Sequence, residues 1–81
     1  MFYVYVLRSE NVGKIYIGHT ADLKKRFGQH NKKLVKSTKA YAPWELLYYE
    51  AFKDQRLAKQ REFKLKYLGR AYGQLKSRIG L

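Results

Sequence analysis

The feature that most constrains the fold is a pair of short apolar runs near the start of the chain. Residues 2–7, Phe-Tyr-Val-Tyr-Val-Leu, and residues 14–18, Lys-Ile-Tyr-Ile-Gly, are rich in the aromatic and β-branched residues that favour strands. Residues 9–13, Ser-Glu-Asn-Val-Gly, supply the polar side chains and the glycine of a loop between them. The sequence therefore predicts an antiparallel β-hairpin at the start of the chain.

Strand alternation sorts the side chains of this hairpin onto two faces, because successive residues of a strand point in opposite directions. In the first run, alternation places Tyr5 on the face opposite Val4 and Val6. In the second run, it places Tyr16 on the same side as Gly18. We therefore expect Tyr3, Tyr5 and Leu7 on one face of the first strand, opposite Phe2, Val4 and Val6.

A first helix is predicted from about Ala21 to Asn31, with Thr20 as its N-cap. The residues at helical spacing that would form its buried stripe are Leu23, Phe27 and Leu34. Residues 32–39 carry four lysines and little periodicity, so we expect a basic loop there.

The second half of the chain predicts one strand and two helices. The strand covers residues 44–50, a helix follows over residues 55–68 and ends at Gly69, and a short helix covers about 70–78. The order ββαβαα predicts an α+β fold in which helices pack on a small three-stranded antiparallel sheet. We expect residues 1–81 to form a single domain.

The charge of the chain restricts the class of partner. Eighteen Lys and Arg residues against six Asp and Glu give a net charge of +12, which favours a polyanion, nucleic acid before an anionic membrane. A basic protein without such a partner is the alternative. No stretch approaches the roughly 20 apolar residues of a membrane span. The absence of cysteine excludes disulfides and fits a cytoplasmic location.

Glu62 is unusual because of its neighbours. It is the one acid between residues 55 and 81, among eight cations: Arg56, Lys59, Arg61, Lys64, Lys66, Arg70, Lys76 and Arg78. A carboxylate in that setting suits a divalent cation beside a phosphate, because Mg²⁺ prefers oxygen ligands. Alternatively, Glu62 and Lys66 form an ordinary i,i+4 surface pair worth about 0.3–0.5 kcal/mol. The residues alone leave both interpretations open.

Arg26 and His30 pose a similar choice. Their spacing of four places both side chains on one side of the first helix. Arginine can hold a phosphate through two parallel hydrogen bonds, and histidine can transfer a proton near neutral pH. The alternative is a boundary arginine beside a histidine that is satisfied within an amphipathic helix.

The ordered set of these residues resembles the GIY-YIG nuclease domain over residues 2 to about 68. It looks closest to the small stand-alone branch of that superfamily, which also resembles the nuclease domain of the bacterial excision-repair C subunit. The first motif departs from its name, because tyrosine and valine replace the glycine and isoleucine. The matching elements are Tyr3-Val4-Tyr5, Tyr16-Ile17-Gly18, Arg26, His30 and Glu62.

The resemblance implies a role for each site residue. Glu62 would hold the single divalent cation, Mg²⁺ or Mn²⁺, and Arg26 would stabilise phosphate charge in the transition state. Tyr5 and Tyr16 would lie near the attacking water, as general base or as positioning groups. Surrounding cations would lower a tyrosine pKa from about 10 by favouring the phenolate. His30 would relay that proton or hydrogen-bond a tyrosine hydroxyl.

The function implied by the resemblance is that of a metal-dependent endonuclease that hydrolyses DNA phosphodiester bonds, structure-selective in DNA repair or recombination. The alternative is a catalytically inactive nucleic-acid-binding module of the same fold. Recognition would come from nucleic-acid shape, from the basic surface or from a protein partner. Candidate phosphate contacts are His19 and the loop residues Lys32, Lys33, Lys36 and Lys39, which could equally form a solvated loop.

Overall fold

The computed structural model describes all residues, 1–81, and has the predicted α+β order ββαβαα with one additional 3₁₀ turn. The elements are β1 (Phe2–Ser9), β2 (Ile15–Thr20), α1 (Leu23–Asn31), η1 (Lys39–Tyr41), β3 (Trp44–Phe52), α2 (Gln55–Tyr67) and α3 (Gly69–Ile79). No helix has both the length and the apolar character needed to cross a membrane.

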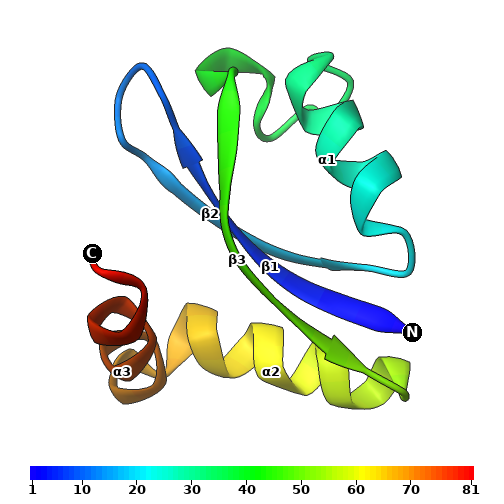
Figure 1. The fold of residues 1–81 in the computed structure, drawn as a ribbon, viewed down its shortest axis with the longest axis vertical. Helices are drawn as coiled ribbons and strands as arrows, with labels where there is room; N and C mark the ends of the chain where they lie inside the picture. Colours follow the sequence, from blue (N-terminus) through cyan, green and yellow to red (C-terminus); the bar gives the residue numbers. More distant parts are fainter.

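The three strands form one antiparallel sheet in the order β2-β1-β3, so the first strand of the chain is the central one. The predicted hairpin is confirmed, and its register pairs Tyr5 with Gly18 and Val6 with Ile17. Figure 1 shows α1 on one face of the sheet and α2 with α3 on the other. Each face of the sheet is therefore covered by different helices.

Each face of the sheet has its own core, as strand alternation predicts. Val4, Val6 and Ile17 pack with residues of α2 and α3 on one face. Tyr5 and Leu7 lie in the other core, on the face covered by α1, together with Ala42, Trp44 and the partly buried Tyr16. Tyr5 and Tyr16 thus face α1, whereas Glu62 lies on a helix that covers the opposite face.

An irregularity in the β1–β3 pairing changes which side chains of β3 face α1. Val6 pairs with Tyr48 and Leu7 pairs with Leu46, so Leu47 has no partner on β1. Such a bulge re-aims the side chains around it. Leu47 and Tyr48 both pack toward α2 and α3, while Leu46 packs on the α1 side. Simple alternation along residues 44–50 does not reveal this change.

The start of α1 differs from the prediction. The N-cap is Asp22, whose Oδ1 accepts a hydrogen bond from the Lys25 backbone amide at 3.0 Å. The Thr20 hydroxyl instead accepts from the Asp22 amide at 3.2 Å. Thr20 and Asp22 are both good caps, and the end of β2 at Thr20 leaves the cap position to Asp22.

The end of α1 explains why Leu34 is not part of its buried stripe. The helix ends at Asn31, and Lys33 then adopts a left-handed conformation with φ of 61°. This reversal carries Leu34 outside the helix, where its side chain is 69% exposed. The end of α2 also differs from the prediction. Leu68 already has extended backbone angles, φ −111° and ψ 97°, so α2 ends before Gly69, and Gly69 is the first residue of α3.

Candidate active site

Two groups of titratable and polar side chains lie near strand β2. The buried chain consists of Tyr5, His30 and Thr38, which lie between the sheet and the segments around α1. The edge cluster consists of His19 on β2 with Glu62 and Lys66 on α2. Tyr16, on the same edge strand, lies between the two groups.

The buried chain is a continuous line of hydrogen bonds. The Tyr5 hydroxyl lies 2.8 Å from His30 Nε2, and His30 Nδ1 lies 2.7 Å from the Thr38 hydroxyl oxygen. The Thr38 hydroxyl donates at 3.4 Å to the carbonyl of Val35, which can only accept. With that direction fixed, Thr38 accepts from Nδ1–H and the Tyr5 hydroxyl donates to Nε2.

Burial keeps both ionisable members of the buried chain neutral. His30 is 0% exposed, and this burial, with the nearby Arg26 charge, lowers its pKa to about 4. Tyr5 is 1% exposed, and burial raises its pKa, with Tyr16 adding to the increase and Arg26 opposing it. The expectation that surrounding cations lower the pKa is therefore wrong for Tyr5, because the loss of hydration dominates.

Gly18 is required by the packing of the two tyrosines. A Cβ atom at this position would lie 2.7 Å from the Tyr5 hydroxyl and 3.0 Å from Cε2 of Tyr16. Gly18 pairs directly with Tyr5 across the strands, so no side chain can separate the two rings. The glycine of the second motif thus allows both tyrosines to reach His30.

Of Tyr5 and Tyr16, Tyr16 is the one with access to the surface. Its ring centroid lies 5.0 Å from that of His30 and 6.2 Å from that of Tyr5. The Lys66 ammonium lies 5.9 Å from the centre of the Tyr16 ring. The Tyr16 ring is half-buried, and its hydroxyl makes no hydrogen bond within the chain. Of the two predicted tyrosines, Tyr16 is the one whose hydroxyl can contact water.

Glu62 is held from both sides in the edge cluster. Its Oε1 contacts His19 Nδ1, and its Oε2 lies 2.5 Å from Lys66 Nζ, so the predicted i,i+4 pair is present. The side chain of Glu62 is 16% exposed. Burial alone would raise its pKa, but the hydrogen bonds from Lys66 and His19 outweigh that effect and lower it. Glu62 is therefore an anion at neutral pH.

A second acid on the same face of the sheet anchors α2. Glu50 on β3 accepts two hydrogen bonds from the guanidinium of Arg61, at 2.8 and 3.1 Å, and one from the Tyr48 hydroxyl at 2.6 Å. Arg61 directly precedes Glu62 on α2. This bidentate pair fixes the rotation of the helix and so directs Glu62 toward the β2 edge.

Arg26 reaches the site from α1. It shares a hollow of about 370 Å³ with His19 and Lys25, beside the start of the helix. Its Nη1 donates at 3.2 Å to Gln29 Oε1, and its charge acts on both Tyr5 and His30. The guanidinium therefore lies between the buried chain and the open hollow.

The structure thus gathers Tyr5, Tyr16, Arg26, His30 and Glu62 around one strand, although they come from four elements. The loop lysines are more dispersed. Lys32, Lys33, Lys36 and Lys39 are all exposed, and only Lys32 lines a hollow near α1.

Sequence reasoning missed two features of this site. Thr38 ends the buried chain, but a threonine among lysines in a predicted loop gives no signal of burial. His19 was predicted as a phosphate contact, and the structure pairs it with Glu62. Its position directly after the second motif was the only sign that it belongs to the site.

The donor set at the edge cluster is compatible with a hard divalent cation. Glu62 supplies two carboxylate oxygens near the surface, and the chain has no group of three or more acidic, histidine or cysteine side chains that could enclose a metal. Mg²⁺ commonly takes only one or two protein carboxylates and keeps several water ligands. Glu62 is therefore a residue that could hold such an ion.

Comparison with known proteins gives consistent matches over most of the chain. A family model described as the GIY-YIG catalytic domain matches residues 1–77. A UPF0213 protein of Bacillus pumilus is 45% identical over 65 residues, which cover 79% of this chain and 65% of that protein. A UPF0213 protein of Clostridium perfringens is 38% identical over 71 residues, covering 86% of this chain and 75% of its own length.

A solved structure also resembles this fold. The solution NMR structure of a UPF0213 protein from Bacillus halodurans superimposes with a TM-score of 0.58 at 34% sequence identity. The match covers 95% of this chain and 84% of that chain.

Proposed function

Because the chain belongs to the GIY-YIG catalytic domain family, a family of nucleases, we propose that it is a metal-dependent endonuclease that hydrolyses DNA phosphodiester bonds. The observation that carries the proposal is that Glu62 and Tyr16 both lie beside Lys66 at the β2 edge. Arg26 lines a hollow together with His19, the other partner of Glu62. In hydrolysis of a phosphodiester, an anionic oxygen donor can hold a metal ion, a surface hydroxyl can orient water, and a guanidinium can stabilise phosphate charge.

Each group has a distinct task in the proposed reaction. A bound Mg²⁺ or Mn²⁺ would stabilise negative charge on the phosphate as a Lewis acid. Glu62 would hold that ion, and His19 and Lys66 hold the Glu62 carboxylate in place. Arg26 binds the phosphate oxygens through charge-assisted hydrogen bonds. Tyr16 orients the attacking water through its hydroxyl or, as the phenolate, accepts a proton from that water.

Tyr5 and His30 are assigned as positioning residues. Their polar atoms are already paired with each other and with Thr38, and neither side chain reaches the surface. The Tyr16 ring lies beside both of them. We propose that the buried chain fixes the orientation of Tyr16, while Tyr16 itself contacts the attacking water.

One observation favours the alternative of an inactive binding module. Both carboxylate oxygens of Glu62 are occupied by side chains of the protein, His19 and Lys66. A chain that only binds nucleic acid would keep this cluster as a structural link between α2 and β2. The net charge of +12 suits either function.

A cleavage assay separates the two functions. Purified protein is incubated with branched, flapped, nicked and single-stranded DNA and with matching RNA, in the presence of Mg²⁺, Mn²⁺ or EDTA. The endonuclease proposal expects metal-dependent product from at least one DNA substrate, and a preference for branched or flapped DNA would fit a role in repair or recombination. Binding that falls steeply with salt, without product under any condition, would instead establish the binding module.

A further inference from the structure

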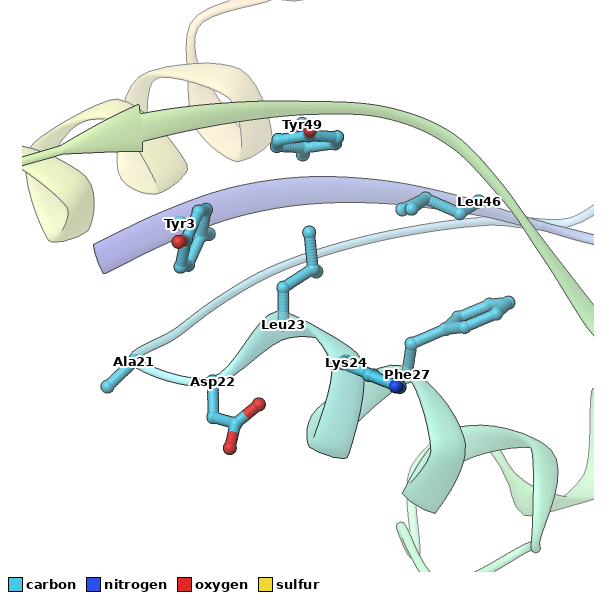
Figure 2. Close-up of a pocket in the computed structure, with 8 residues that line it drawn as sticks. All are labelled: Tyr3, Ala21, Asp22, Leu23, Lys24, Phe27, Leu46 and Tyr49. Carbon is cyan, nitrogen blue, oxygen red and sulfur yellow. The ribbon is translucent and has the colours of Figure 1, made fainter. Parts of the chain in front are cut away.

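An apolar pocket of about 540 Å³ lies between α1 and the sheet, away from the edge cluster. Figure 2 shows Leu23 and Phe27 reaching from α1 toward the strands, with Tyr3, Leu46 and Tyr49 on the opposite side. Its size falls within the range of small-molecule pockets. Neither the buried chain nor the edge cluster uses these residues.

The β-bulge at Leu47 creates the aromatic wall of this pocket. Leu46 and Tyr49 are three residues apart, so regular alternation would place them on opposite faces. The unpaired Leu47 brings both of them to the α1 side. Tyr49 remains 54% exposed, and its ring packs against that of Tyr3 at 6.1 Å in an edge-to-face geometry. One aromatic face is thus left open toward solvent.

The pocket continues into the hollow that contains Arg26. The apolar pocket and a neighbouring hollow share Lys24, and that hollow shares Lys25 with the one lined by Arg26 and His19. Asp22 lines all three, but its carboxylate caps the Lys25 amide. A concave path with lysines along its side therefore leads from the proposed reaction centre, around the start of α1, to the aromatic pocket.

We propose that the pocket binds one unpaired nucleobase of the strand whose phosphate lies at Arg26. This inference rests on the proposed function, because it assigns the kind of nucleic acid that the site accepts. Aromatic rings stack on the faces of bases, and the lysines of the path suit the phosphates between base and site. A base inside a duplex is stacked and paired, so the occupant must be single-stranded or displaced from a helix.

Charge argues for this occupant over a second copy of the chain. A dimer formed through the pocket would bring together two proteins that each carry a charge of +12, with lysines beside the contact. A nucleic acid strand brings phosphates to the same lysines. The pocket therefore gives the protein a way to select strands with at least one unpaired base.

Fluorescence anisotropy in EDTA tests this assignment without cleavage. The probes are a labelled single-stranded DNA, the same strand with single abasic sites introduced at successive positions, and a duplex of the same sequence. We expect one abasic position to weaken binding by about fivefold to a hundredfold in the wild-type protein. Tyr49→Ala should remove this sensitivity, Tyr49→Phe should retain it, and duplex binding should be the same in all three proteins.

The controls address folding and specificity. Circular dichroism reports the fold, and if Tyr49→Ala does not fold, Tyr49→Leu keeps apolar bulk without an aromatic face. Tyr67 on α2 is 68% exposed but lies outside the pocket, so Tyr67→Ala should retain the abasic sensitivity. The proposal is overturned by sensitivity that survives loss of the Tyr49 ring, by equal loss in Tyr67→Ala, or by a Tyr49-dependent dimer in analytical ultracentrifugation. Absence of cleavage with intact abasic sensitivity would contradict the nuclease proposal alone.

Discussion

The buried chain and the edge cluster are neighbours that differ in their access to water. In the buried chain, Tyr5, His30 and Thr38 are each at most 1% exposed, and their polar atoms are paired. In the edge cluster, the side chains of His19, Glu62 and Lys66 are 28%, 16% and 34% exposed. Both are polar networks, but only the edge cluster is open to a ligand from solvent.

The resemblance to the nuclease family groups Tyr5, His30 and Glu62 in one site, but their access to water divides them between the two networks. A fully paired buried network is costly to disturb, because any orphaned group loses its hydration without compensation. The ion pairs of the edge cluster are partly exposed and contribute less to stability, since water can replace a lost partner. The buried chain should therefore control the free energy of unfolding, and the edge cluster should control catalysis.

Replacing the metal ligand should give the largest effect and test the catalytic side of the comparison. In Glu62→Gln we expect cleavage to fall by about a thousandfold or more, because the amide cannot supply the anionic charge that holds the cation. The free energy of unfolding should change by less than about 1 kcal/mol, since the partners of Glu62 remain near water. Single-turnover cleavage and urea denaturation measure the two quantities.

Glu45 offers a matched control for this substitution. It is an exposed glutamate on β3 outside the edge cluster, so Glu45→Gln should retain full activity. Cleavage by Glu62→Gln at the wild-type rate would remove Glu62 from the mechanism.

Removing the centre of the buried chain should give the next largest effect. His30→Ala leaves the hydroxyls of Tyr5 and Thr38 without their partner and opens a cavity, so we expect a loss of about 3 kcal/mol in the free energy of unfolding. His19→Ala, which removes the partly exposed histidine, should cost less than about 1 kcal/mol. Urea denaturation of both variants measures the contrast. Equal losses would show that the two networks do not differ in the way their burial indicates.

The sequence predicted the placement of site residues only where that placement follows from the regular spacing of side chains along one strand or helix. Strand alternation correctly placed Tyr5 on the face opposite Val4 and Val6, because the side chains of a strand repeat every two residues. Helical spacing correctly predicted the pair between Glu62 and Lys66.

The features that were missed depend on contacts between distant segments or on a break in periodicity. Thr38 is buried by His30 and Val35, although its own neighbours are lysines. The contact between His19 and Glu62 joins residues 43 positions apart. The bulge at Leu47 arises from pairing with β1, which strand propensity does not describe.

The pH dependence of stability should reveal the buried chain. The pKa of His30 is lowered from 6.5 to about 4 in the folded protein, so the unfolded chain binds a proton first as pH falls. Stability is then fully present above pH 6.5 and is lost toward pH 4. Glu50 and Glu62, with pKa values lowered from 4.5, weaken the fold only below that pH.

The window between pH 6.5 and 4.5 therefore isolates the histidine contribution. Between these two pH values we expect the free energy of unfolding to fall by about 2 kcal/mol. Urea denaturation at each pH measures this loss. His30→Gln should flatten the curve in this window, whereas Glu62→Gln should leave it unchanged. If the stability of His30→Gln falls with pH as steeply as that of the wild type, the group that titrates in this window is not His30.

The two tyrosines give the smallest and most selective test of the comparison, because Tyr→Phe removes only a hydroxyl. Tyr5→Phe leaves His30 Nε2 without its donor, so we expect a loss of about 1 kcal/mol in the free energy of unfolding. Tyr16→Phe removes a hydroxyl with no partner in the chain, so stability should stay within about 0.5 kcal/mol while the cleavage rate falls. Thermal denaturation and single-turnover rates across pH measure both. A pH profile that changes in Tyr5→Phe but not in Tyr16→Phe would transfer the water-contacting role to the buried tyrosine.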